Sequence, residues 1–67
     1  MNKIVTIREK EILDLLITNY TTKDISEELG FSEKTVRNHI SNVMQKLGVK
    51  SRSQAIIELL KLDILKL

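Results

Sequence analysis

The segment from Lys34 to Ile57 carries basic and amide side chains with no carboxylate among them. Its basic residues are Lys34, Arg37, Lys46, Lys50 and Arg52, while the acidic residues gather in 9–14, in 24–33 and from Glu58 onward. Such a segment can donate hydrogen bonds to phosphates and base edges without repelling a polyanion. The charge distribution therefore favours a surface that binds a polyanion, and a merely solvated basic face remains the alternative.

The composition limits what this chain can be. Its 67 residues, 42% of them hydrophobic, allow one small domain with a thin core. The chain has no cysteine and one histidine, so we expect no disulfide, no metal site and no cofactor. No apolar run is long enough to span a bilayer, which predicts a cytoplasmic protein without membrane contact. A large catalytic cleft does not fit this size, so we do not expect an enzyme.

Capping residues and hydrophobic spacing predict four helices, and no proline interrupts them. Thr6 with Glu9 opens the first, Thr21 or Thr22 the second, Ser32 the third, and Ser51 with Gln54 the fourth. Gly30 and Gly48 end the second and third helices. The fourth is expected over about 52–63, and residues 64–67 as a frayed tail or a last turn. The predicted fold class is therefore all-α.

The second and third predicted helices are joined by the short turn Gly30-Phe31-Ser32, with Phe31 expected as a buried anchor. A short helix, a glycine-containing turn and a longer helix are typical of a helix-turn-helix. In the third helix Val36, Ile40, Val43 and Leu47 fall on one side. The opposite side carries only polar side chains, namely Lys34, Asn38, Ser41, Asn42 and Gln45. A solvated helix face usually mixes glutamate with lysine, so this composition favours DNA binding.

The run TTKDISEELGFSEKTVRNHISNVMQKLGVKSRSQA, residues 21–55, resembles the LuxR-type helix-turn-helix family. The resemblance includes the upstream REKEIL and covers about residues 6–62. Ser26 departs from the alanine that is common at this position in the family, and serine is nearly as small as alanine. The family implies a four-helix DNA-binding domain over 1–67, with its helix-turn-helix at about 21–47 and a dimerisation helix at about 52–63. The runs SEKTVRNHISN, MQKLGVK and RSQA are especially similar to a stand-alone regulator of late sporulation genes.

The family reads bases from the third helix, and four positions match here in place, though the residue types vary. We expect base contacts from Lys34, Arg37, Asn38 and Ser41, because arginine can hold guanine and asparagine can hold adenine. A phosphate contact is the alternative for Arg37. We expect phosphate contacts from Thr22, Lys23, Thr35, His39 and Lys46. Plain helix capping is compatible with the role of Thr22, and a packed core imidazole is the alternative for His39. Lys50 and Arg52 could add general attraction, or Arg52 could form an internal ion pair.

The fourth predicted helix has more apolar surface than one packing face needs. We assign Ala55, Ile56 and Leu59 mainly to the core. Ile57 and Leu60 are the expected contact of a homodimer, and coverage by the first helix or the tail is the alternative.

The sequence therefore predicts a dimeric transcription regulator that reads a degenerate inverted repeat in double-stranded DNA. RNA polymerase is a candidate further partner, sporulation a candidate process, and the nucleoid the expected location. The alternative is a protein-interaction module or anti-activator that acts through the fourth helix. Met1 favours a complete protein over an excised domain.

Overall fold

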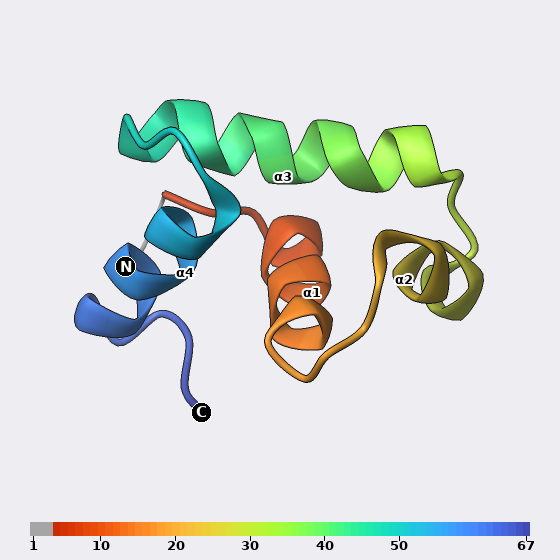
Figure 1. Cartoon of the computed structure of the whole chain (residues 1–67), viewed down its shortest axis with the longest axis horizontal. Coiled ribbons are helices and arrows are strands. Elements are labelled where there is room, and N and C mark those ends of the chain that lie inside the picture. Colours follow the sequence, from red (N-terminus) through yellow and green to blue (C-terminus); the bar gives the residue numbers. More distant parts are fainter. Residues whose placement is uncertain (1–3) are drawn as a thin grey trace.

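The computed structural model describes residues 4–67 and contains four α-helices in that range. They are α1 (Ile7–Leu16), α2 (Thr22–Leu29), α3 (Glu33–Leu47) and α4 (Arg52–Lys61). Figure 1 shows α3 lying along one side of the molecule, with α2, α1 and α4 arranged beneath it in that order. The all-α, helix-turn-helix prediction is confirmed. The first three residues of the predicted 1–67 domain, Met1 included, lie outside the described residues.

Each helix begins at a hydroxyl side chain that caps it. The side chains of Thr6, Thr21, Ser32 and Ser51 accept hydrogen bonds from backbone N–H groups three residues later. Thr21, and not Thr22, is the cap of α2, with Asp24 completing a reciprocal box. At α4 the predicted box differs, because Gln54 Oε1 accepts from the backbone N–H of Lys50 at 3.0 Å.

Left-handed residues cap α2 and α3 and follow shortly after the ends of α1 and α4, although the sequence indicated only the first two. These residues are Asn19, Gly30, Gly48 and Asp63, with φ of 70°, 76°, 70° and 60°. The N–H of the residue after each of them donates a hydrogen bond to the carbonyl five residues earlier, as from Phe31 to Ser26 at 3.0 Å. Asn19 and Asp63 adopt this conformation because short polar side chains tolerate it. The fourth helix is consequently two residues shorter than predicted.

Two apolar clusters support α3. The first cluster consists of Ile12, Ile25, Val36 and Ile40, and the second cluster consists of Leu13, Val43, Leu59 and Leu65. Ile12 and Leu13 are neighbours in α1, about 100° apart around the helix, so this helix supplies both clusters. Because α3 contributes to both clusters, its orientation is fixed at two places along its length.

Three packing expectations need correction. Leu65 is 1% exposed, so the expected frayed tail is wrong at this residue, whereas Leu67 at the end of the chain is 97% exposed. The N–H of Leu65 and that of Ile64 both donate to the carbonyl of Leu59, at 3.2 and 2.9 Å. Phe31 is half-buried, because it packs beside the first cluster without entering it. Ala55 and Leu59 are core residues, whereas Ile56 is only half-buried.

Candidate nucleic-acid interface

The outer side of α3 is a continuous polar surface. The predicted base contacts Lys34, Arg37, Asn38 and Ser41 are all exposed, and so are Asn42 and Gln45. Their spacing of three, four and seven residues brings the first four into one stripe. Val36, Ile40 and Val43 on the opposite side are buried. The chain therefore uses one side of α3 for its core and leaves the other side exposed.

One carboxylate stands at the beginning of this stripe. Glu33 Oε1 lies 3.6 Å from Arg37 Nη1, and both side chains are about half exposed. An exposed pair of this spacing contributes only about 0.3–0.5 kcal/mol, so Arg37 can exchange its partner at small cost. Along the rest of α3, from Lys34 to Leu47, the chain has no acid.

Three predicted phosphate contacts share a second stripe of α3, beside the first. Thr35 and His39 are half-buried and Lys46 is exposed. Thr35 Oγ1 accepts from Ser32 Oγ at 3.0 Å. The His39 ring lies 6.2 Å from the ring of Phe31, centroid to centroid, so its environment is an aromatic contact at the edge of the core.

Lys46 is held by a buried carboxylate. Its Nζ donates to Glu9 Oε1 at 2.6 Å, and the Glu9 side chain is 5% exposed. Burial by itself raises the pKa of Glu9. The hydrogen bonds from Lys46 and the Thr6 N–H, with the nearby positive charges of Lys46 and His39, outweigh burial and leave this pKa below its ordinary value. Glu9 thus stays ionised and fixes the direction of Lys46, whose ammonium has further donors for a phosphate.

Thr22 and Lys23 lie in the first turn of α2, at the positions where helical N–H groups lack partners within the helix. Thr22 Oγ1 accepts from Arg52 Nη1 at 3.4 Å, so Arg52 makes a hydrogen bond to α2 where an internal ion pair was the alternative. Lys23 is exposed. The contact brings the beginnings of α2 and α4 together, although 30 residues separate them in the sequence.

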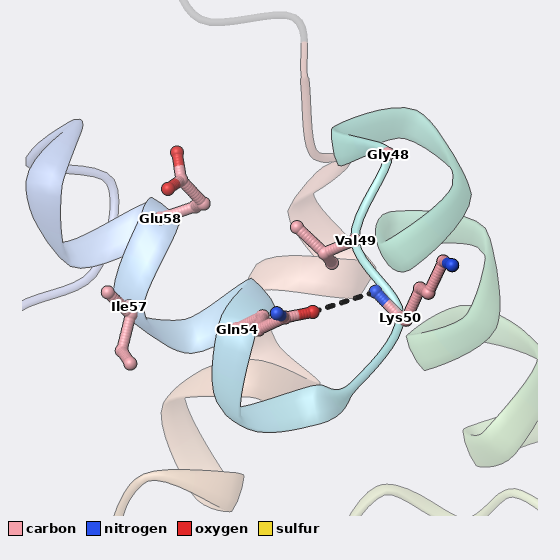
Figure 2. A pocket seen from close by; sticks show the side chains of 6 residues that line it. All are labelled: Gly48, Val49, Lys50, Gln54, Ile57 and Glu58. Atoms are coloured by element: carbon pink, nitrogen blue, oxygen red, sulfur yellow. Dashed lines mark hydrogen bonds between the residues drawn. The ribbon is translucent and has the colours of Figure 1, made fainter.

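The two predicted dimer residues differ in exposure. Ile57 is 50% exposed, whereas Leu60 is half-buried against the second cluster. Ile57 also lines an open hollow of about 300 Å³ between α4 and the loop after α3. Figure 2 shows the Gln54 side chain extending from α4 toward the backbone N–H of Lys50, so the lining includes a polar contact. Lys50 and Glu58 also line the hollow.

The structure adds two residues that sequence reasoning did not assign. Glu9 was recognised only as a capping residue, and Arg8 only as part of the REKEIL run. The guanidinium of Arg8 lies 4.6 Å above the ring of Phe31, on the α2–α3 turn. Both contacts join residues far apart in the sequence, so no local spacing could have predicted them. Residues 4–67 contain no group of three potential metal ligands and no helix able to span a membrane.

Comparisons with known proteins agree with this geometry. Residues 3–59 match the family described as "Bacterial regulatory proteins, luxR family". The chain is 61% identical over 64 residues to Spore germination protein GerE of Bacillus subtilis (strain 168), spanning 96% of this chain and 86% of that protein. It is 48% identical to Transcriptional regulatory protein DegU of Brevibacillus brevis, of which it spans 25%.

A solved structure supports the same relationship. The fold matches "Structure of Transcription factor, GerE" with a TM-score of 0.93 and 62% identity, over 97% of each chain. The resemblance to the LuxR-type family and to GerE, drawn from residues 8–55, is confirmed. The assignments of individual contact residues stay predictions.

Proposed function

The chain belongs to the LuxR family of bacterial regulatory proteins, which bind DNA through a helix-turn-helix, and we propose that it acts as a sequence-specific, dimeric transcription regulator. Its α3 enters the major groove of a degenerate inverted repeat, and the two half-sites lie about one helical turn apart. The relatives' names assign them to transcription and, for GerE, to spore germination. We extend the proposal to the cell: the protein acts in sporulation, is located in the nucleoid and has RNA polymerase as a partner.

The exposed outer side of α3, which has no acid from Lys34 onward, carries the proposal. A 15-residue helix is about 22 Å long and fits a major groove about 12 Å wide. Lys34, Arg37 and Asn38 lie in its N-terminal half, the part of a recognition helix that reaches deepest. Ser41 continues their stripe.

Phosphate contacts on both sides of the groove hold this helix in register. Thr35, His39 and Lys46 form one side along α3. The first turn of α2 supplies the other with Thr22 and Lys23, whose free N–H groups and positive helix end favour an anion. Most of the affinity comes from such contacts and falls steeply with salt.

A salt titration against a selected duplex and a scrambled duplex tests the DNA-binding proposal. Asn38→Ala or Arg37→Ala is expected to cost about 1–3 kcal/mol on the selected duplex and to reduce the preference over the scrambled one. Binding unchanged by both substitutions would contradict the base-contact assignment. A chain that binds neither duplex, but associates with another regulator through α4, would instead support the anti-activator alternative.

The dimer is best tested at Ile57, because replacing Leu60 would also disturb the second cluster. Ile57→Glu is expected to yield monomers in sedimentation and to weaken binding to the two-half-site duplex. Leu62→Glu is a matched control, since Leu62 is also 50% exposed but lies about 140° further round. If Ile57→Glu still sediments as a dimer, the proposed interface is wrong.

A further inference from the structure

Arg8 is a cation on α1 that lies over Phe31, in the turn that leads into α3. Its Cζ is 4.6 Å from the centroid of the Phe31 ring, and the same ring lies 6.2 Å from the His39 ring. Phe31 therefore joins a guanidinium from α1 to a predicted phosphate contact of α3. We refer to Arg8, Phe31 and His39 as the aromatic corner.

The guanidinium keeps donors available in this corner. Its one carboxylate partner within residues 4–67 is Glu11, at 3.1 Å, and both side chains are 47% exposed. Exposed pairs of this kind are weak, and arginine has five N–H donors. Stacking on a ring restricts the planar group while leaving its edge free, which suits a phosphate.

Lys10 provides the contrast on the same helix. It is also 47% exposed and pairs with Asp14 at 2.9 Å, so its charge and exposure match those of Arg8. Lys10 comes two residues after Arg8, so it lies about 200° from Arg8 around the helix axis. There it lines a hollow on the α4 side with Val5, Leu62 and Ile64. The two cations therefore lie on different sides of α1, and only Arg8 lies against the turn that leads into α3.

We propose that Arg8 binds a backbone phosphate of duplex DNA, extending the phosphate contacts of Thr35 and His39 onto α1. This inference rests on the proposed DNA-binding function. The contact touches no base, so it strengthens binding to every sequence equally. Phe31 acts as a positioning residue that holds the guanidinium over the turn between α2 and α3.

The test compares Arg8→Ala with Lys10→Ala in salt titrations on selected and scrambled duplexes, using the full chain. Arg8→Ala is expected to weaken binding to both duplexes about three- to tenfold and to reduce the salt slope by about one. Lys10→Ala, which removes the same charge, should leave the slope unchanged. Arg8→Lys should retain the slope while losing part of the affinity, because the charge remains and the stacking is lost.

Phe31→Leu keeps an apolar side chain and the net charge, and it should weaken binding without reducing preference. Thermal unfolding of each variant separates these effects from loss of fold. If Arg8→Ala and Lys10→Ala alter affinity and slope equally, Arg8 makes no specific contact and the inference is overturned. If the unchanged chain binds neither duplex, the proposed function itself is overturned.

Discussion

The two ends of α3 rest on different kinds of support. Its N-terminal half lies on the first cluster, whose members all come from helices α1, α2 and α3. Its C-terminal half lies on the second cluster, which is completed by Leu65 from beyond the last helix. Helical spacing alone reveals the first kind of support. The second requires the chain after α4 to fold back, which the left-handed Asp63 allows.

The polar contacts around α3 differ in the same way. Near its N-terminal end the Ser32 cap and the Glu33–Arg37 pair are local and exposed. Near its C-terminal end the Glu9–Lys46 pair spans 37 residues and buries its carboxylate. The polar contacts at the N-terminal end of α3 are thus local, although the apolar packing beneath it joins three helices. The polar contact at the C-terminal end joins residues far apart in the sequence.

The largest expected effect tests the role of the tail in the second cluster. Leu65→Ala should lower the free energy of unfolding by about 2–5 kcal/mol, since it removes a side chain that is 1% exposed. Leu67→Ala, two residues later and 97% exposed, is the matched control and should be close to neutral. Urea unfolding measures both. A neutral Leu65→Ala would mean that the second cluster closes without the tail.

The next effect concerns the buried pair at the C-terminal end of α3. Glu9→Gln should lower stability at neutral pH by about 1–3 kcal/mol, because a charged hydrogen bond in a buried site is lost. Asp14→Asn, which breaks the exposed Lys10 pair, should change stability by less than about 0.5 kcal/mol. Equal effects of the two substitutions would indicate that burial of Glu9 adds nothing.

The same pair gives a pH dependence with a definite sign. The pKa of Glu9 is lower in the folded chain than its ordinary value of 4.5. Its stabilising contribution is therefore complete above that value and is lost as the pH falls through the folded-state pKa. Urea titrations from neutral to acid pH should show the Glu9→Gln variant losing less stability than the unchanged chain. If the stability of both chains falls equally with pH, Glu9 is not the group responsible.

The smallest effect tests local support under the N-terminal half of α3. Thr21→Ala should cost about 1 kcal/mol, because Thr21 accepts from the Asp24 N–H at 3.0 Å and caps α2. Thr22→Ala loses only the long contact from Arg52 and should cost less in stability. It should instead weaken DNA binding if Thr22 contacts a phosphate. The reverse order in thermal unfolding would identify Thr22 as the cap.

The sequence by itself determined the four helices, their N-terminal caps to within one residue, and the outer side of α3, which has no acid from Lys34 onward. These features depend on residues within about four positions of one another, which is the range of capping bonds and helical periodicity. Only the tertiary structure decided that Leu65 is a core residue, that Glu9 holds Lys46, and that Arg8 lies over the ring of Phe31. Each of these depends on the angles at which helices pack, and those angles follow from how the two clusters fill space rather than from local spacing.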